Sequence, residues 1–467
     1  MNSKLVSALM LLVSAPCLAD TVVLPPGSNI QQWIDILGDG DVIQLQDGLY
    51  DPAGTLTPAG KSITIRGETD AFGNPTSVIS GGGVFRVIEC VDGEGAGTVF
   101  ENLVIRDGRA EFTAGLQSGG GIFCVEASPT IRNCTFLRNV ADQEGGGLYI
   151  RSGAPEVIGC RFVGNTAGKG AGAFVFSTGA NPPWTLVFDG CRFTNNEAKD
   201  IDEVDFPFGE GGGLYIENTD AVLESCIFQG NRSGLRAGGL HAEDQQLILI
   251  DCRFEDNSSA IGGAIHARGC SLDLEGCWFE RNIAGALHAE ECSILAARSK
   301  FLANLQAENG GAVHHRSTTA VYIECDFEGN VASDDGGALY RRDNSSSLTL
   351  ASCQLIGNVA GGTGGGVWGG VLQLADSVIC ANVPNQIAGG SIAEDLGGNL
   401  ISDVGPCIPL PGDFDGNFVI DGADLAVVLG QWGPCRRGEC VADLDGNRNV
   451  NGGDLALLLA YWGSYGP

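Results

Sequence analysis

Residues 272–288 read Leu-Asp-Leu-Glu-Gly-Cys-Trp-Phe-Glu-Arg-Asn-Ile-Ala-Gly-Ala-Leu-His, and this stretch decides the fold. Leu272 and Leu274 are separated by one residue, as are Cys277 and Phe279, which is typical of short strands that bury one face. The two residues between these runs turn a corner. Asn282 marks the next corner, because Asn tolerates the left-handed backbone conformation and can stack its amide on its neighbours.

The same unit recurs from about residue 130 to 382, as Cys-x-Phe-x-x-Asn, a loop, Gly-Gly-Ala/Gly, an aliphatic residue and a ring. Its Phe/Asn pairs are Phe136/Asn139, Phe162/Asn165, Phe193/Asn196, Phe228/Asn231, Phe254/Asn257, Phe279/Asn282, Phe301/Asn304 and Phe327/Asn330, followed by the degenerate pairs Leu355/Asn358 and Ile379/Asn382. A constant motif at intervals of 22 to 35 residues indicates fixed strands joined by loops of variable length. One unit cannot bury its inner face alone, so we predict a parallel β-helix whose coils stack about 4.8 Å apart.

Eight of the 17 cysteines hold one repeat position, which predicts a buried column of free thiols. The members are Cys134, Cys160, Cys191, Cys226, Cys252, Cys277, Cys325 and Cys353. Ser299 and Ser377 fill the missing places, so no bridge is required there. Cys270 and Cys292 are a candidate local pair, and Cys435 with Cys440 is the best disulfide candidate because a short loop separates them.

The chain divides into four segments. Residues 1–19 resemble a secretory signal peptide, with Lys4, an apolar stretch and small residues before Asp20. The other segments are the β-helix at 20–405 (N-terminal capping helix and early coils 20–130, regular repeats 131–382, closing coil 383–405), a Pro-containing linker at 406–411 and a calcium-binding module at 412–467. We find no later apolar run long enough to span a membrane, so the mature protein is expected to be secreted or held at a bacterial cell surface.

The Phe-x-x-Asn motif with the Gly-Gly-Ala-aliphatic motif at residues 262–265, 310–313 and 336–339 resembles the repeats of chlamydial-type polymorphic outer-membrane proteins. The capping segment resembles that of pectin-lyase-like β-helices. These resemblances imply an all-β, right-handed parallel β-helix over most of residues 20–405. The fold hosts adhesins, lyases and hydrolases alike, so it does not select an activity.

Two acidic segments near the C-terminus align with each other and predict calcium sites. Their expected ligands are Asp413, Asp415, Asn417, Val419 (through its carbonyl), Asp421 and Asp424 in the first loop, and Asp443, Asp445, Asn447, Asn449 (through its carbonyl), Asn451 and Asp454 in the second. Oxygen ligands at loop positions 1, 3, 5, 7, 9 and 12 suit Ca²⁺. An apolar helix is expected after each loop. The duplication resembles a type I dockerin and implies a small α-helical domain with a cohesin-like or cell-envelope docking partner. Position 6 departs from the expected Gly, being Phe418 and Arg448.

Rings recur directly after the Gly-Gly-Ala-aliphatic motif. The candidate ligand face comprises Tyr215, His241, His266, His288, His314, Tyr340 and Trp368. Because the aliphatic residue points inward, we expect these rings to point outward onto a solvated face, next to charges of both signs two residues further on. Three interpretations stay open: a structural ladder, a platform on which sugars stack, or a zinc site between adjacent imidazoles.

The net charge of −31, from 57 acidic and 26 basic residues, excludes a nucleic-acid partner and favours divalent cations. The repeat contains no convincing catalytic constellation. The sequence therefore favours a non-enzymatic, exported adhesion or glycan-binding protein that attaches through its calcium module. The alternative is an extracellular polysaccharide lyase or glycoside hydrolase, for which two suitably spaced carboxylates would be needed.

Overall fold

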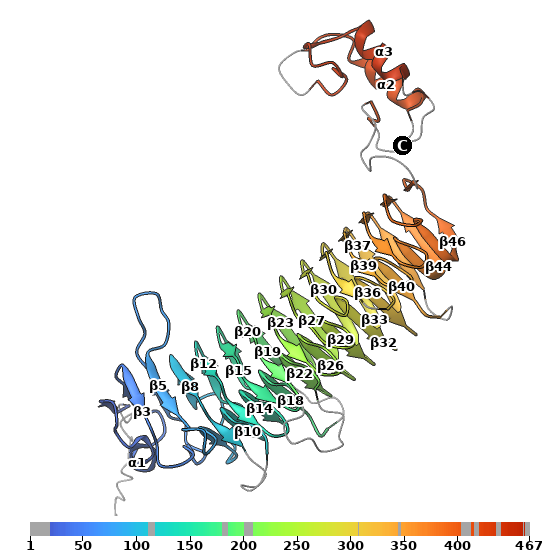
Figure 1. The fold of residues 1–467 in the computed structure, drawn as a ribbon. Coiled ribbons are helices and arrows are strands. Elements are labelled where there is room, and N and C mark those ends of the chain that lie inside the picture. Colours follow the sequence, from blue (N-terminus) through green and yellow to red (C-terminus); the bar gives the residue numbers. More distant parts are fainter. Residues whose placement is uncertain are drawn as a thin grey trace, which may run out of the picture.

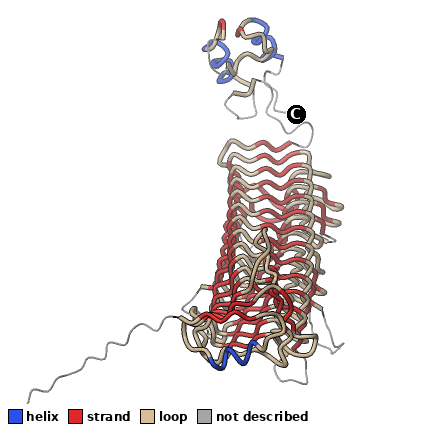
Figure 2. Tube along the Cα trace, turned by 90° about the vertical axis from the view of Figure 1, so that its left-hand side faces the viewer, coloured by secondary structure: helices blue, strands red, loops and turns tan. Residues whose placement is uncertain are grey.

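The computed structural model describes residues 19–110, 117–179, 185–199, 209–306, 308–343, 347–402, 412–414, 420–435, 440–460 and 462. Within residues 19–402 the chain winds through successive coils that stack along one axis, as Figures 1 and 2 show. Equivalent strands of neighbouring coils pair in parallel, so each coil adds one strand to each of several ladders. This is the predicted parallel β-helix. The signal-peptide segment and the linker at 406–411 lie outside the described residues, apart from residue 19.

The strands form two long ladders that join at β44, a third long ladder, and short ladders at a corner. The ring ladder comprises β6 (Ile88–Cys90), β10 (Ile122–Val125), β14 (Leu148–Arg151), β18 (Ala173–Phe176), β22 (Leu214–Glu217), β26 (Leu240–Glu243), β29 (Ile265–Arg268), β32 (Leu287–Glu290), β36 (Val313–Arg316), β40 (Leu339–Arg341) and β44 (Val367–Ala375). The central ladder comprises β1 (Thr21–Leu24), β2 (Val42–Leu45), β4 (Thr64–Arg66), β7 (Val99–Glu101), β11 (Thr130–Arg132), β15 (Glu156–Ile158), β19 (Leu186–Asp189), β23 (Ala221–Glu224), β27 (Gln246–Ile250), β30 (Ser271–Glu275), β33 (Ser293–Ala297), β37 (Thr319–Ile323), β41 (Leu348–Ala351), β44 and β46 (Ile387–Asp395).

The phenylalanine ladder comprises β3 (Gly48–Tyr50), β5 (Ser77–Ser80), β8 (Leu103–Arg106), β12 (Thr135–Leu137), β16 (Arg161–Val163), β20 (Arg192–Thr194), β24 (Ile227–Gln229), β28 (Arg253–Glu255), β31 (Trp278–Glu280), β34 (Lys300–Leu302), β38 (Asp326–Glu328), β42 (Gln354–Ile356), β45 (Val378–Cys380) and β47 (Leu400–Ser402). The short corner ladders are β9 (Arg109–Ala110), β13 (Val140–Ala141), β17 (Thr166–Ala167), β21 (Glu197–Ala198) and β25 (Arg232–Ser233), then β35 (Leu305–Gln306), β39 (Val331–Ala332) and β43 (Val359–Ala360).

The predicted inward columns are present. From Phe136 to Phe327 the rings stack in register, with centroids 4.6 to 5.0 Å apart, and all of them are fully buried. The cysteine column is buried and its thiols are free. Burial raises the pKa of the Cys160 and Cys191 thiols, which keeps them protonated and unreactive. The column therefore serves packing.

A ladder of buried asparagines runs beside the phenylalanines. The side-chain amide of Asn231 donates to Oδ1 of Asn257 at 3.0 Å and to the carbonyl of Phe193 at 2.8 Å, and its backbone N–H donates to the same Oδ1 at 3.0 Å. The same pattern repeats from Asn139 to Asn358. Each amide thus satisfies buried backbone groups of the neighbouring coil, which an apolar side chain would leave unpaired.

The expectation that the ladder asparagines adopt the left-handed conformation is wrong. That conformation belongs to the residue before each of them: Arg281 has φ 53°, Ala303 has φ 50° and Gly329 has φ 63°. A left-handed residue at the corner turns the chain, so the following Asn can point its amide into the core.

The predicted pairing of Cys270 with Cys292 is also wrong, because both thiols are free. The two residues occupy the same corner of adjacent coils, and the backbone N–H of Cys270 donates to Sγ of Cys292 at 3.4 Å. Cys435 and Cys440 are joined by a disulfide, and Cys380 is disulfide-bonded as well.

Helix α1 (Ile30–Ile36) precedes the early coils and buries Ile30 and Ile34 in the solenoid core. The Lys61 ammonium donates to three backbone carbonyls at its C-terminal end at 2.7, 2.9 and 3.0 Å, which satisfies groups that the helix itself leaves free. Its function as a cap of the first coil stays a prediction.

The C-terminal segment contains helices α2 (Gly422–Gly430) and α3 (Gly452–Ala460) and an antiparallel pair, β48 (Gly433–Pro434) with β49 (Asn449–Val450). It has a small core of its own, made by Ile420, Val428, Ala442, Val450 and Leu458. No helix of the described residues is long and apolar enough to cross a membrane.

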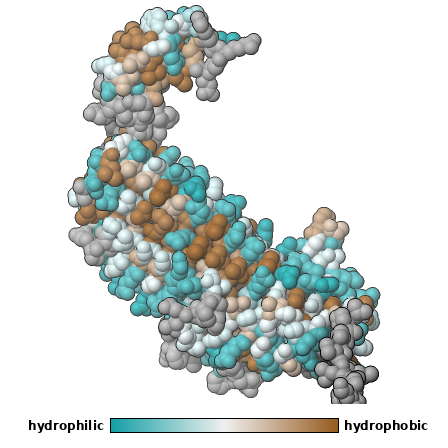
Figure 3. Space-filling model, turned by 180° about the vertical axis from the view of Figure 1, so that it is seen from behind, coloured by the Kyte–Doolittle hydropathy of each residue, from teal (hydrophilic) through white to brown (hydrophobic). Residues whose placement is uncertain are grey.

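The surface is mostly polar, but Figure 3 shows hydrophobic side chains gathered over several coils of one face. Exposed apolar residues include Ile283 and Leu305 at two successive levels of the corner, and Val359 and Val383 at two later ones. The same corner carries polar residues such as Arg232 and Ser258 in earlier coils.

Replacing one ladder asparagine should destabilise the solenoid strongly. We expect Asn257→Ala to lower the free energy of unfolding by about 3 kcal/mol, because it leaves the backbone N–H and one side-chain N–H of Asn231 and the carbonyl of Phe228 without the partner that Asn257 supplies. Urea denaturation checks the value. Gln229→Ala, at an exposed position of the same coil region, should stay within about 0.5 kcal/mol of the wild type. Equal effects of the two changes would contradict the structural importance of the ladder.

Candidate functional site

The rings that follow the Gly-Gly motif form one column along the ring ladder. It consists of Phe123, Tyr149, Phe174, Tyr215, His241, His266, His288, His314, Tyr340 and Trp368. Neighbouring centroids lie 4.5 to 5.5 Å apart. We call this the ring column. Strand register imposes it, because each ring occupies the same position of its strand.

The expectation that these rings lie on a solvated face is wrong for most of them. Tyr215, His241 and His266 are 1 to 2% exposed and His288 is 9% exposed, whereas His314, Tyr340 and Trp368 are half-buried. Neighbouring rings cover one another's faces, so only the edges of the rings can contact other groups. A platform on which sugars stack face to face is therefore not available along the column.

Charged side chains flank the ring column on both sides. On one side are the residues two positions after the rings, among them Glu217, Glu243, Arg268, Glu290 and Arg316, with ion pairs between Arg268 and Glu243 at 3.1 Å and between Arg316 and Glu290 at 3.4 Å. On the other side is a line that the sequence analysis missed: Glu144, Lys169, Glu210, Arg236 and Ile261, joined by bridges from coil to coil. Arg236 and Lys169 both pair with Glu210, at 2.6 and 3.0 Å.

A constant spacing would have revealed this second line. Each of its members precedes the ring of its coil by five residues, as Glu210 precedes Tyr215 and Arg236 precedes His241. The sequence signal is weak because the residue type at this position changes from coil to coil. The loop that precedes the position also differs in length between coils.

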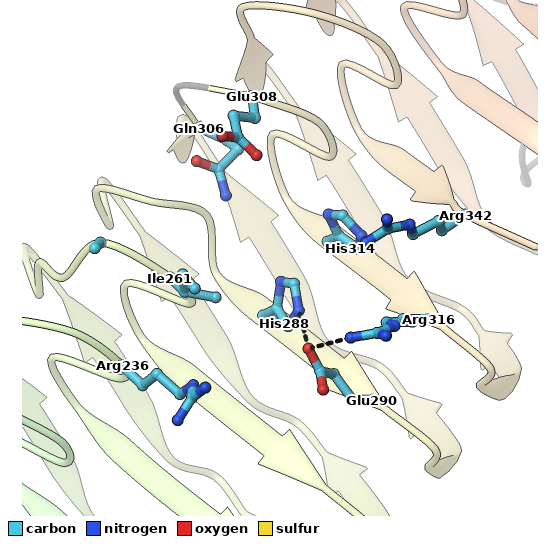
Figure 4. A pocket seen from close by; sticks show the side chains of 10 residues that line it. Arg236, Ile261, His288, Glu290, Gln306, Glu308, His314, Arg316 and Arg342 are labelled. Atoms are coloured by element: carbon cyan, nitrogen blue, oxygen red, sulfur yellow. Dashed lines mark hydrogen bonds and ion pairs between the residues drawn. The ribbon is translucent and has the colours of Figure 1, made fainter. Parts of the chain in front are cut away.

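A cavity of about 410 Å³ borders two of the histidines, His288 and His314. Figure 4 shows its lining: Arg236, Ala260, Ile261, His288, Glu290, Gln306, Glu308, His314, Arg316 and Arg342. His288 Nε2 lies 3.2 Å from Glu290 Oε1, and Arg316 reaches the same oxygen. Among the described residues Arg342 makes no ion pair, and its side chain is exposed. Three guanidinium groups therefore border one cavity of a protein whose net charge is −31.

The neighbouring imidazoles lower the pKa of two carboxyl groups of this region, and burial lowers the pKa of two imidazoles. Hydrogen bonding to His288 lowers the pKa of Glu290 to about 2, and the nearby imidazole of His241, whose Nε2 is 3.8 Å from the carboxylate, lowers the pKa of Glu243 to about 2. Burial lowers the pKa of His266 well below its usual value and that of His314 to about 3. At neutral pH the cavity thus presents an ionised carboxylate at Glu290 and a neutral imidazole at His314.

A second hollow, of about 290 Å³, lies over an earlier part of the ring column. It is lined by Glu144, Tyr149, Arg151, Phe174, Phe176, Thr178 and Glu217. Burial raises the pKa of both Glu144 and Glu217. Two carboxyl groups with raised pKa values in one hollow are the kind of pair that general acid catalysis uses.

His315, next to the column in sequence, belongs to the opposite face of its strand. It is 1% exposed, lies in the solenoid interior, and its Nε2 is 2.8 Å from the hydroxyl of Tyr322. Burial lowers its pKa to about 3. Arg341 occupies the same inward position in the next coil, is 2% exposed, and donates to the carbonyl of Val371 at 2.9 Å.

The second C-terminal loop brings three of the predicted calcium ligands together. Asp443, Asp445 and Asp454 each offer an oxygen within 4.8 Å of the others. Oδ1 of Asp443 is buried and has no hydrogen-bond partner among the described residues. Arg448, at loop position 6, adopts φ 63°, the conformation for which Gly is usual. This geometry fits a hard cation that accepts oxygen ligands.

The remaining loop ligands are placed less completely. Asp424 and Asp454 are fully buried, and each accepts backbone N–H groups from the start of its loop and from the residue before its helix. Asn447 and Asn451 hydrogen-bond within the second loop. In the first loop Asp415, Asn417 and Val419 lie outside the described residues, while Asp421 caps helix α2.

The model of a sequence family described as "Right handed beta helix region" matches residues 77–318 and 200–374 of the chain. No curated protein sequence matches it.

Among solved structures, tailspike protein 3 of bacteriophage CBA120 is similar over 77% of this chain and 55% of the tailspike, with a TM-score of 0.42 and 10% identity. This chain thus spans about half the length of the tailspike that it matches. A mannuronic acid specific family 6 lyase from human gut microbiota is similar over 80% of this chain and 92% of the lyase, with a TM-score of 0.36 and 10% identity. The surface protein and adhesin PfbA of Streptococcus pneumoniae is similar over 77% of this chain and 91% of the adhesin, with a TM-score of 0.26 and 11% identity.

His315 should make the solenoid sensitive to mild acid. Its pKa falls from about 6.5 in the unfolded chain to about 3 in the fold, so its contribution to stability is complete above pH 6.5 and declines as the pH falls toward 3. We expect His315→Leu to reduce the loss of stability between pH 7 and pH 5 by roughly 2 kcal/mol. Urea denaturation at both pH values measures it. An unchanged pH dependence in the variant would contradict the assignment.

Proposed function

The chain belongs to the right-handed β-helix family, and from this premise we propose that it is an exported protein that binds an acidic polysaccharide along the ring column. The observation that carries the proposal is the cavity of about 410 Å³ bordered by Arg236, Arg316 and Arg342. Guanidinium groups bind carboxylate and sulfate-like anions through paired, charge-assisted hydrogen bonds. A uronate-containing or sulfated sugar offers such groups at regular intervals.

The buried faces of the ring column favour this ligand over a neutral glycan. Neutral sugars bind proteins largely by stacking on exposed aromatic faces, and these faces are covered here. What the cavity offers instead are imidazole edges, three guanidinium groups and the amide of Gln306, beside the carboxylates of Glu290 and Glu308. Recognition would depend on hydrogen bonds and ion pairs, and the high negative charge elsewhere on the protein would confine a polyanion to this region.

We propose that the C-terminal segment is a calcium-folded, dockerin-like module that attaches the protein to a partner. Its second loop supports a calcium ion at Asp443, Asp445 and Asp454. The two helices leave apolar side chains exposed, among them Leu429, Trp432, Leu457 and Leu459, at 40 to 55%. Such side chains suit a cohesin-like or cell-envelope partner that buries them. The disulfide between Cys435 and Cys440 fits an oxidising, extracellular location.

A second candidate function is hydrolysis or lyase cleavage of the bound polysaccharide. It is favoured by the pair Glu144 and Glu217, whose pKa values burial raises and which line one hollow on the course of the ring column. A protonated carboxyl near neutral pH can act as a general acid on a glycosidic oxygen. In this second candidate function, the arginine-lined cavity would bind the polysaccharide, and Glu144 and Glu217 in the hollow would cleave it.

The glycan proposal predicts a preference for anionic polymers. Calorimetric titration with pectate or alginate should show binding that a neutral glucan lacks, and Arg342→Ala should weaken it about tenfold because one guanidinium contact is lost. Arg192→Ala, an exposed arginine of the phenylalanine ladder, is the matched control and should bind as the wild type does. Equal binding by Arg342→Ala and the wild type would overturn the placement of the ligand.

The same titrations test the second candidate if the polymer is recovered and its chain length measured. Shortened products that disappear with Glu144→Gln and Glu217→Gln, while binding persists, would establish cleavage. An unchanged polymer would leave binding as the function.

The calcium module predicts a stabilisation that depends on the metal. At a free Ca²⁺ concentration a hundredfold above the dissociation constant, the C-terminal segment should gain about 2.7 kcal/mol against unfolding for each ion that it binds. Circular-dichroism melting of the full chain with calcium and with chelator measures the gain, and calorimetry should count two ions. Asp443→Ala should remove one of them, whereas Glu197→Gln, at a surface position of the solenoid, should remove none. Two ions in Asp443→Ala would contradict the assignment.

A further inference from the structure

We propose that His266, His288 and Glu290 form a binding site for a divalent transition-metal ion, with zinc as the best chemical fit. The three residues come from adjacent strands, β29 and β32, and one potential ligand atom of each lies within 4.8 Å of the others. Two imidazoles with one carboxylate make a ligand set that suits zinc and is too rich in nitrogen for calcium or magnesium. The site goes beyond glycan binding and does not depend on it.

The ligand atoms of the three residues must move slightly closer together to bind one zinc ion. Zinc holds nitrogen and oxygen ligands at about 2.0 to 2.2 Å, so two ligands on one ion lie no more than about 4.2 Å apart. His288 Nε2 and Glu290 Oε1 already satisfy this limit, at 3.2 Å. The rings of His266 and His288 are parallel, with centroids 5.2 Å apart. A tilt of one ring brings their edges together, and His288 and His314 already show a tilt of 36° within the same column.

The burial of the imidazoles gives an independent reason to expect a ligand. Both ring nitrogens of His266 and Nδ1 of His288 are buried and have no hydrogen-bond partner among the described residues. His266 is 2% exposed. A buried polar atom without a partner costs about 1 to 3 kcal/mol. Metal coordination would satisfy one of the two unpartnered nitrogens of His266, while His288 would coordinate through Nε2, the nitrogen that lies next to Glu290. A neutral imidazole supplies the lone pair that coordination requires.

The surroundings have the arrangement of an accessible metal site. His288 and Glu290 line the cavity of about 410 Å³, so an ion bound to them would keep a coordination position open toward that space. Arg316 lies 3.4 Å from the Glu290 oxygen and can orient the carboxylate. His266 lies next to His288 at the preceding level of the ring column and is 2% exposed, so it would bind the ion from that side.

The preceding coil provides a natural comparison. His241 and Glu243 have the same spacing as His288 and Glu290, but His241 Nε2 is 3.8 Å from Glu243. Glu243 accepts instead from the hydroxyl of Tyr215, at 3.3 Å, and pairs with Arg268. The ring before His241 is Tyr215, which offers no ring nitrogen. His241 is therefore outside the proposed site although it occupies the same position of the repeat.

Substitution by Phe removes a ligand and keeps the column. Phe stands at the ring position in Phe123 and Phe174, so His266→Phe, His288→Phe and the control His241→Phe preserve a ring at each level. Glu290→Gln is a further variant that changes no ring. Circular-dichroism spectra and urea midpoints establish that each variant is folded, and a variant that fails this test is replaced in the comparison by Glu290→Gln.

The experiment uses the full chain, freed of metal by chelator and then dialysed into excess Ca²⁺, with no saccharide present. Titration with Co²⁺ followed by absorption, and with Zn²⁺ followed by calorimetry, should show one ion per chain. His266→Phe and His288→Phe should weaken binding about 100-fold or more, Glu290→Gln should weaken it, and His241→Phe should bind as the wild type does.

Three results would overturn the proposal. The first is the absence of Zn²⁺ binding to the folded wild-type chain in calcium. The second is equal binding by the wild type and His266→Phe or His288→Phe. The third is a thiolate-to-cobalt absorption band, which would place the ion on a cysteine. None of these results bears on whether polysaccharide binding depends on Arg342, so the two proposals fail separately.

Discussion

The structure depends on the vertical register between coils. Asn231 donates through both its backbone N–H and its side-chain amide to one oxygen of Asn257, and this pattern continues through the regular repeats. A slip by one residue would direct every inward side chain outward and would break these bonds together. The buried amides therefore fix which residues stand above which, and the stacked phenylalanines supply the apolar burial that the fixed register makes possible.

The same register creates the ring column, although no amide ladder lies beside it. Once the coils are aligned, whatever residue follows the Gly-Gly-aliphatic motif must stack on its equivalents. The column changes from Phe and Tyr to His between Tyr215 and His241 and returns to Tyr at Tyr340. Four successive levels of the ring column therefore carry imidazoles, whereas the other levels carry Phe, Tyr or Trp rings.

Charge is organised by the same alignment. A protein of net charge −31 nevertheless assembles Arg236, Arg316 and Arg342 around one cavity, because three loops and strands of different coils converge there. Carboxylates at neighbouring levels, such as Glu210 and Glu290, pair with arginines and keep part of this positive charge compensated. In both pairs the arginine is the more exposed partner, at 42 and 50%, so its positive charge lies toward the surface.

The sequence by itself determined the parallel β-helix, its inward columns of Phe, Cys and Asn, and the stacking of the rings, because these follow from a periodic motif that can bury its inner face only on copies of itself. It also identified the acidic loops whose second copy clusters Asp443, Asp445 and Asp454. Only the tertiary structure decided that His266 is buried, that Cys270 and Cys292 remain thiols, and that the left-handed residue precedes each ladder Asn. Alternation along a strand tells which side a residue faces, whereas burial on the outer side depends on neighbouring coils and on loops that the motif does not specify.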